Sequence, residues 1–354
     1  MNQNNITELI RQFDNGDMFE AIRSFPAQII HSVDQMKSWE AKNHFENIQN
    51  ILVLGMGGSA IGGDIVKVIA QNDCKIPIIV NRSYRVPSWV SQNTLVIASS
   101  YSGNTEETLS AYQDAKDRGA NFIAMTTGGK LAELANMSEY DIIPMISGLQ
   151  PRAAVGYSFT LLIGILIRLG FLPTSYFDLL SAAAQSIIDY AGLLSDYTVP
   201  NHALDVSRQL MNTIPVIYGS EDTTWVAALR MRGQLAENSK MMAFHHHIPE
   251  MNHNEIEGWG SYPELLKNLS IVWIPDESDH SRSLARMDIT ENLLSSIPGV
   301  QIKLNCEGNN RLERLLKLIH LIDWISYYLA LFNQVDPSPV NRIMKLKSKM
   351  SEIR

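Results

Sequence analysis

The chain has little of what marks a secreted, membrane-bound or nucleic-acid-binding protein. Its 354 residues include only two cysteines, Cys74 and Cys306. Two cysteines are too few for a disulfide framework, so we expect buried thiols in a reducing compartment. Acidic residues outnumber basic ones by 37 to 29, giving a net charge of −8. A chain of that charge is a poor candidate for broad binding to nucleic acids or anionic membranes.

Long apolar runs are also lacking. The N-terminal residues have no apolar core of the kind that a signal peptide requires. The longest apolar stretch, residues 159–172, contains Arg168 and is shorter than the roughly 20 residues of a membrane span. We therefore expect a cytoplasmic enzyme or binding protein.

Short apolar segments alternate with helical patterns along most of the chain. Strands that are apolar throughout are typical of a parallel sheet with helices on both faces. The alternation stops at Gly148, two long helical patterns follow, and it starts again at Ile214. We therefore expect an α/β protein with two doubly wound parallel-sheet domains linked by helices. The expected divisions are an N-terminal helical segment (1–45), a first domain with linker helices (46–195), a second domain (196–334) and a C-terminal tail (335–354).

Two strand-to-helix loops of the first half are candidates for binding a phosphate. Glycines in the first loop let the backbone approach a ligand, and the helix that follows offers free N–H groups. The second loop, residues 100–105, places three hydroxyls around Gly103. An ordinary helix N-cap is the alternative for the second loop, but a cap explains only one hydroxyl. The predicted phosphate-binding residues are Gly57, Gly58, Ser59, Ser100, Ser102 and Thr105.

The first loop also fits a dinucleotide-binding pattern, G-x-G-x-x-A, through Gly55, Gly57 and Ala60. That type of site requires an acidic residue at the end of the second strand. This chain has Asn81 and Arg82 there instead. We therefore expect no nicotinamide or flavin cofactor.

Several motifs resemble those of one enzyme family. GMGGSAIGGD (residues 55–64) and SYSGNTEET (residues 100–108) resemble a sugar-isomerase (SIS) domain. With GLQPRAAVGYSF, QLAENSK, MNHNEIEGW and VDPSPV, the chain is similar to the bifunctional phosphoglucose/phosphomannose isomerases from about residue 40 to its end. The resemblance implies two SIS-type, flavodoxin-like domains. It also implies an enzyme of carbohydrate metabolism that interconverts glucose 6-phosphate or mannose 6-phosphate with fructose 6-phosphate, without a cofactor or a metal.

Two other functions remain open at this point. One is a glucose-6-phosphate isomerase of single specificity, because the packing of the sugar pocket decides which aldoses react. The other is a non-catalytic regulator that senses sugar phosphates, because SIS domains also serve regulators. Such regulators usually carry a DNA-binding element, and the first 40 residues here have an acidic lean and no basic patch.

Isomerising an aldose to a ketose requires a base, a group that opens the sugar ring and positive charge for the enediolate. Glu237 ends a predicted helix, where the dipole disfavours a carboxylate and makes it a better proton acceptor. The alternative is a solvated glutamate at a helix end. The resemblance assigns the base to Glu237, ring opening to His253 and the enediolate charge to Arg152. It also implies that the tail returns to the site through Lys347, although Lys345 is a second candidate.

A run of histidines raises the possibility of a metal site. His245, His246 and His247, with Glu250 and His253, offer enough ligands for a metal ion. The spacing does not fit a helical H-E-x-x-H motif, and Pro249 prevents an i, i+4 pair on a helix. We therefore expect no metal.

The segment from His245 to Trp259 has a loop-like composition with large apolar residues interspersed. An exposed apolar surface more often than not has a partner that covers it, and a two-fold homodimer is the commonest assembly. The family resemblance implies a homodimer in which His253 completes the active site of the other subunit.

Overall fold

The computed structural model describes residues 3–353, and contacts divide the chain into two compact units. Unit 1 comprises Met1–Arg23, Tyr190–Glu307 and Lys317–Arg354, and unit 2 comprises Ser24–Asp189 and Gly308–Leu316. This grouping follows contacts and does not test the domain boundaries expected from the sequence, which stay a prediction.

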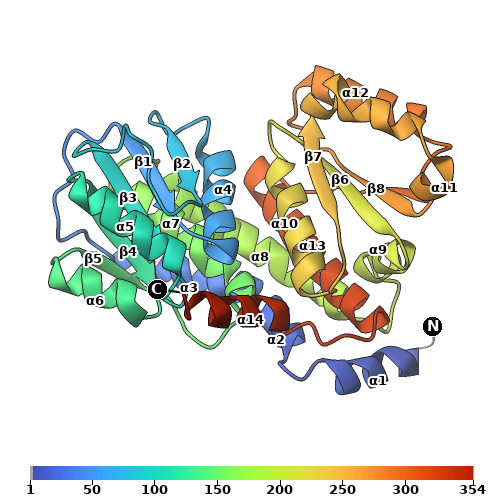
Figure 1. The fold of residues 1–354 in the computed structure, drawn as a ribbon, viewed down its shortest axis with the longest axis horizontal. Helices are drawn as coiled ribbons and strands as arrows, with labels where there is room; N and C mark the ends of the chain where they lie inside the picture. The colour runs from blue at the N-terminus through green and yellow to red at the C-terminus, as the bar shows by residue number, and fades with distance from the viewer. Residues whose placement is uncertain (1–2, 354) are drawn as a thin grey trace. The chain divides into compact units, whose positions relative to one another are not determined.

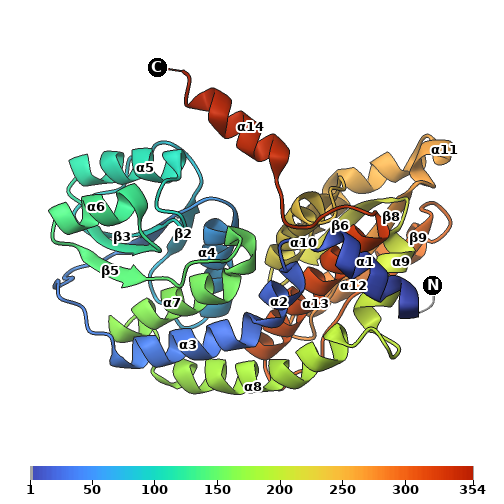
Figure 2. The ribbon, with the colours of Figure 1, turned by 90° about the horizontal axis from the view of Figure 1, so that it is seen from below.

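Unit 2 is built on a five-stranded parallel sheet with the order β2-β1-β3-β4-β5 (Figure 1). Helices α5 and α6 cover one face of the sheet, and α4 and α7 lie on the other (Figure 2). The elements are α3 (Phe25–Ser38), β1 (Asn50–Leu54), α4 (Gly57–Ala70), β2 (Ile78–Asn81), β3 (Thr94–Ser99), α5 (Glu106–Asp117), β4 (Asn121–Thr126), α6 (Gly129–Met137), β5 (Asp141–Pro144), η1 (Pro151–Ala153), α7 (Val155–Arg168) and most of α8 (Ser175–Ser195).

Both faces of the unit 2 sheet are buried, which explains why its strands are apolar throughout. Leu52 and Leu54 pack with α5 and α6, while Val53, between them, faces α4 at Gly63. The order of the strands reverses between β1 and β3, where Leu54 lies opposite Ala98. In open α/β sheets, ligands bind at the carboxyl ends of the strands at such a switch point.

Unit 1 is built on a four-stranded parallel sheet with the order β7-β6-β8-β9. The fold class expected from the sequence, α/β with two parallel sheets, is confirmed. The elements are α1 (Gln3–Phe13), α2 (Met18–Arg23), α9 (His202–Leu210), β6 (Ile214–Ser220), α10 (Trp225–Glu237), β7 (Phe244–Ile248), η2 (Glu250–His253), η3 (Glu255–Gly260), α11 (Pro263–Leu266), β8 (Leu269–Ile274), α12 (Ser281–Leu293), β9 (Val300–Lys303), most of α13 (Arg311–Phe332) and α14 (Asn341–Met350).

Helix α13 is long and apolar enough to cross a membrane by length and composition alone. However, 94% of its most apolar window is buried inside the fold. The helix is therefore a core helix of the protein.

Two sequence expectations need correction. The segment from His245 to Trp259 is not a loop at its start, because its first four residues lie in Phe244–Ile248, an edge strand that pairs in parallel with β6. The cysteines are free but only partly buried, rather than fully buried. Burial nevertheless raises the pKa of the Cys306 thiol to about 12.

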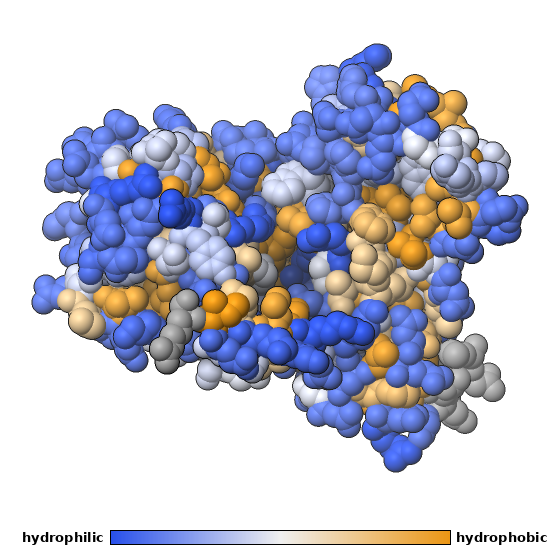
Figure 3. Space-filling view, viewed as in Figure 1, coloured by the Kyte–Doolittle hydropathy of each residue, from blue (hydrophilic) through white to orange (hydrophobic). Residues whose placement is uncertain are grey.

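The tail helix α14 is exposed along its whole length. In Figure 3, blue hydrophilic atoms follow the band where Figure 1 places α14. The helix also exposes apolar side chains, among them Met344 and Leu346. An isolated helix of ten residues is only marginally stable in water. Packing of the apolar side chains of α14 would therefore stabilise the helix.

Candidate active site

The loop between β1 and α4 brings a buried arginine close to a helix start. Gly57 opens α4 with a φ of +51°, a left-handed conformation that suits glycine. A Cβ on Gly58 would meet the backbone oxygen of Pro151 at 2.3 Å, so only glycine lets η1 approach this closely. Arg152 follows in η1 and is 4% exposed. The glycines therefore bring Arg152 beside the first loop.

The first turn of α4 is suited to an anion. It contains no acidic side chain, and no side chain caps its N–H groups. Ser59 lies in this turn and is buried. Free N–H groups and the positive end of the helix dipole favour a negatively charged group at this place.

The loop between β3 and α5 holds the predicted hydroxyls. Ser100 and Thr105 are hydrogen-bonded through their hydroxyls at 3.0 Å, while Ser102 is exposed. Thr105 stands at the N-cap position of α5, but its side chain makes no capping hydrogen bond. The simple N-cap alternative therefore does not describe Thr105. Because β1 and β3 are neighbouring parallel strands, the loops that follow them lie side by side at the carboxyl ends of the strands.

Tyr101 ties the second loop to the segment before Arg152, a link that the sequence alone does not reveal. Its hydroxyl donates to the backbone oxygen of Ile146 at 2.8 Å and accepts the N–H of Leu149 at 3.0 Å. Burial raises the pKa of Tyr101, so the hydroxyl keeps its proton for this link. The described contacts thus bring together the predicted phosphate residues and Arg152.

Glu237 is the last residue of α10, as the sequence predicts, and its side chain is half-buried. The turn after it is hydrogen-bonded to α13. Asn238 donates to the Ser326 hydroxyl at 2.9 Å, and Ser239 donates to the Ser326 backbone oxygen at 2.6 Å. Lys240 donates to the backbone oxygens of Glu237 and Pro337. The end of α10 is therefore fixed to both the core and the tail segment.

A buried ion pair holds α10 itself in place. Arg230 contacts Asp323 of α13 through two parallel hydrogen bonds of 2.9 and 2.6 Å. Gln234, one turn later in α10, donates to the same carboxylate at 2.9 Å. Burial raises the pKa of Asp323, and the arginine and glutamine oppose this effect. This network fixes the helix whose end carries Glu237.

His253 and Lys347 are both exposed. His253 ends η2, directly after the edge strand β7, and Lys347 lies in α14. Both belong to unit 1 with Glu237, whereas Arg152 and the phosphate loops belong to unit 2. The grouping of all these residues into one active site therefore stays a prediction.

The histidine run lies on β7. His247 faces Glu221 at 3.2 Å, and the His246 and His247 rings are in edge contact. Burial and the charge of Arg232 lower the pKa of His245 to about 4. Within residues 3–353, no three His, Cys, Asp or Glu side chains converge in a way that could hold a metal ion.

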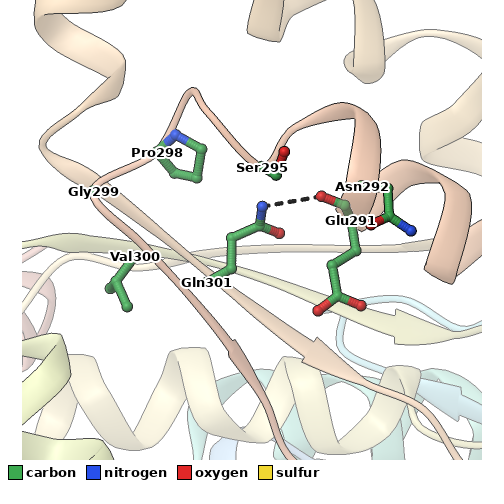
Figure 4. Close-up of a pocket in the computed structure, with 7 residues that line it drawn as sticks. All are labelled: Glu291, Asn292, Ser295, Pro298, Gly299, Val300 and Gln301. Atoms are coloured by element: carbon green, nitrogen blue, oxygen red, sulfur yellow. Dashed lines mark hydrogen bonds between the residues drawn. The ribbon is translucent and has the colours of Figure 1, made fainter.

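A surface cavity of about 400 Å³ lies between the end of α12 and the start of β9 (Figure 4). One hydrogen bond crosses it, from the Gln301 amide to the backbone oxygen of Glu291 at 3.1 Å. None of the predicted site residues lines this cavity. It therefore carries no argument for the chemistry described above.

Comparison with known proteins tests the family resemblance. Residues 44–157 match the SIS domain family, and residues 200–350 match the family described as the bacterial phospho-glucose isomerase C-terminal SIS domain. A bifunctional phosphoglucose/phosphomannose isomerase of Caldicellulosiruptor bescii is 44% identical over 95% of this chain and 100% of its own length. The chain belongs to the bifunctional phosphoglucose/phosphomannose isomerase family. A member from Aquifex aeolicus is 36% identical over 86% of this chain and 91% of its own length.

The fold comparison agrees with family membership. The C-terminal domain of glucosamine-fructose-6-phosphate aminotransferase from Francisella tularensis superposes with a TM-score of 0.70. It is 17% identical and covers 90% of this chain and 96% of its own. At that identity the match shows the fold alone, and that fold is the double SIS arrangement that the sequence motifs predict.

Proposed function

We propose that this protein interconverts glucose 6-phosphate and mannose 6-phosphate with fructose 6-phosphate through an enediolate. The observation that carries the proposal is the match along the whole length of the Caldicellulosiruptor bescii isomerase. Hexose 6-phosphates are the substrate class that this family implies. The two neighbouring loops at the switch point of unit 2 suit the phosphate of such a sugar.

Each reacting group has a proposed role. Glu237 moves the proton between C1 and C2, because a carboxylate at a helix end is a competent base. Arg152 holds the enediolate oxygens with its permanent charge. His253 opens the ring by passing a proton to and from the ring oxygen, since an imidazole nitrogen can both donate and accept a proton. Lys347, or its neighbour Lys345, assists from the tail.

Assembly is part of the proposal. Met242, just before the edge strand β7, is 64% exposed, and Phe244, the first residue of that strand, is 53% exposed. Exposed apolar side chains next to an unpaired strand edge favour a partner, and a second copy is the commonest one. We place His253 in the site of that second subunit. A cytoplasmic location is the matching environment for its free thiols.

The test supplies either mannose 6-phosphate or fructose 6-phosphate, with glucose-6-phosphate dehydrogenase as the only other enzyme. It measures the formation of NADPH. A dual-specificity isomerase converts mannose 6-phosphate to fructose 6-phosphate and then to glucose 6-phosphate, so NADPH accumulates. An isomerase specific for glucose phosphate gives a signal from fructose 6-phosphate only, and a regulator gives none. Equal rates before and after dialysis against EDTA would support the expectation that no metal takes part. The matched control is the Glu237→Gln variant, which should remain silent with both sugars.

A further inference from the structure

The segment that carries His253 contains neither an α-helix nor a β-strand between β7 and α11. It consists of two short 3₁₀ turns, η2 and η3, between β7 and α11. His253 ends the first turn with an exposed side chain. The position of its imidazole therefore depends on what fixes the residues on either side.

One fixed point is the hydroxyl of Tyr218, in the middle of β6. This hydroxyl donates to the carboxylate of Glu255 and accepts the indole N–H of Trp259 at 3.0 Å. Both partners lie in η3, which begins two residues after His253. The Tyr218 ring is fully buried and stacks on Trp273 of β8, with 4.9 Å between ring centroids. The sheet therefore sets the position of the hydroxyl that holds η3.

The second fixed point lies on the other side of His253. The Asn252 amide donates to the Thr290 hydroxyl of α12 at 2.8 Å, and Met251 is fully buried. Asn254, next to His253, accepts the backbone N–H of Glu255 at 2.6 Å. The histidine is thus the exposed apex of a turn that is attached to the sheet and to α12.

We infer that Tyr218, acting through Glu255 and Trp259, is a positioning residue for His253 in ring opening. This inference rests on the role proposed above for His253. Tyr218 acts only through η3, and no role in contact with the sugar is assigned to it. Burial raises the pKa of Tyr218, and the hydrogen bond to Glu255 raises it further. The hydroxyl therefore stays a donor to Glu255 at any pH at which the protein works.

Ring opening can be measured apart from isomerisation. An enzyme that opens and recloses a sugar ring exchanges the α and β anomers of fructose 6-phosphate, and NMR exchange spectroscopy reports that rate. In a Glu237→Gln background the carbon-to-carbon proton transfer is blocked, whereas anomer exchange through His253 should continue. Adding Tyr218→Phe should slow anomer exchange by about 10²-fold, since a misplacement of about 1 Å costs that much. Fructose 6-phosphate affinity should change less than twofold.

The matched control is Tyr328→Phe in the same background. Tyr328 is also fully buried, stacks on a tryptophan (Trp324) and donates one buried hydrogen bond, to the backbone oxygen of Leu194 at 2.7 Å. The Tyr328→Phe substitution should leave the rate of anomer exchange unchanged. The Glu255→Gln variant, which keeps an acceptor oxygen for Tyr218, should retain most of the exchange rate. The Glu255→Ala variant should lose most of the exchange rate. Because Glu255 is half-exposed, this variant tests the same contact if Tyr218→Phe fails to fold.

The outcomes separate the two proposals. If His253→Ala in the Glu237→Gln background leaves anomer exchange intact, the proposed role of His253 is wrong. If His253→Ala abolishes exchange while Tyr218→Phe and Glu255→Ala match the Tyr328→Phe control, only the positioning role is overturned.

Discussion

At the scale of single residues, Glu237 is the side chain on which the chemistry depends most. Glu237→Gln keeps the shape of the side chain but cannot accept a proton. General-base catalysis contributes roughly 10²–10⁴-fold, so kcat should fall at least that far while substrate affinity is retained. Steady-state kinetics and calorimetric binding of fructose 6-phosphate measure the two quantities. Turnover close to that of the unchanged protein would remove Glu237 from the mechanism.

The hydroxyls of the second loop are expected to bind the phosphate. Replacing Ser102 and Thr105 together by alanine should raise KM for both aldose phosphates at least tenfold, because each hydrogen bond to a charged group contributes roughly 1.5–3 kcal/mol. Thr105 does not cap α5, but the variant loses the hydrogen bond between the Thr105 and Ser100 hydroxyls, so the unfolding free energy should fall by about 1 kcal/mol. An unchanged KM would place the phosphate elsewhere.

Local features made much of the candidate site predictable from sequence. A helix end at Glu237 and a glycine loop after β1 follow from short patterns of residues. The supports of these residues were not predictable, because they depend on contacts between distant segments. Tyr101 reaches Ile146, and Asn238 reaches Ser326, without any local signal in the sequence.

At the scale of elements, α13 contains a histidine that should make stability depend on pH. His320 is fully buried and accepts the indole N–H of Trp324 at 3.0 Å. Burial, and then the charge of Arg230, lower the pKa of His320 to about 3. An unfolded histidine has a pKa of about 6.5, so between these values only the unfolded chain binds the proton. This effect therefore lowers stability as the pH falls below about 6.5.

The unfolded chain binds one proton more than the folded chain in this range. The unfolding free energy should therefore fall by about 1.4 kcal/mol for each pH unit well below 6.5. Urea unfolding at pH 7, 5.5 and 4.5 measures it. His320→Gln keeps an acceptor for the indole and does not titrate, so its stability should depend on pH less steeply by this amount. Identical slopes for the two proteins would show that His320 does not cause the effect.

The strands were predictable where both faces of the sheet are buried. One of the short apolar segments, residues 269–274, forms β8, where Leu, Ile, Val and Trp fill both faces. The edge strand β7 was missed. Its sequence FHHHI is only partly buried, and three histidines hide the apolar pattern of a strand. Edge position is a property of the sheet, so the sequence of one strand does not report it.

At the scale of the whole molecule, the two sheets differ in their first strand-to-helix loop. In unit 1 the loop after β6 contains Glu221 and Asp222, and Thr224 fills it by accepting the Ser220 N–H at 2.8 Å. Carboxylates repel a phosphate, so the chain should bind one sugar phosphate and not two. Calorimetry of Glu237→Gln with fructose 6-phosphate should give a stoichiometry near one per chain. A second site of similar affinity would contradict this expectation.

The shared active site is the most demanding prediction about the molecule. Glu237→Gln and His253→Ala should each be inactive as homodimers. In a mixed dimer with shared sites, one site combines the intact Glu237 of one chain with the intact His253 of the other. After full subunit exchange of an equal mixture, half of the dimers are mixed, so roughly a quarter of normal activity should return. If one chain supplied both residues, every site would keep a defect and no activity would return. Exchange itself is verified by mass spectrometry of isotopically labelled chains, so a silent mixture that has exchanged would overturn the shared site.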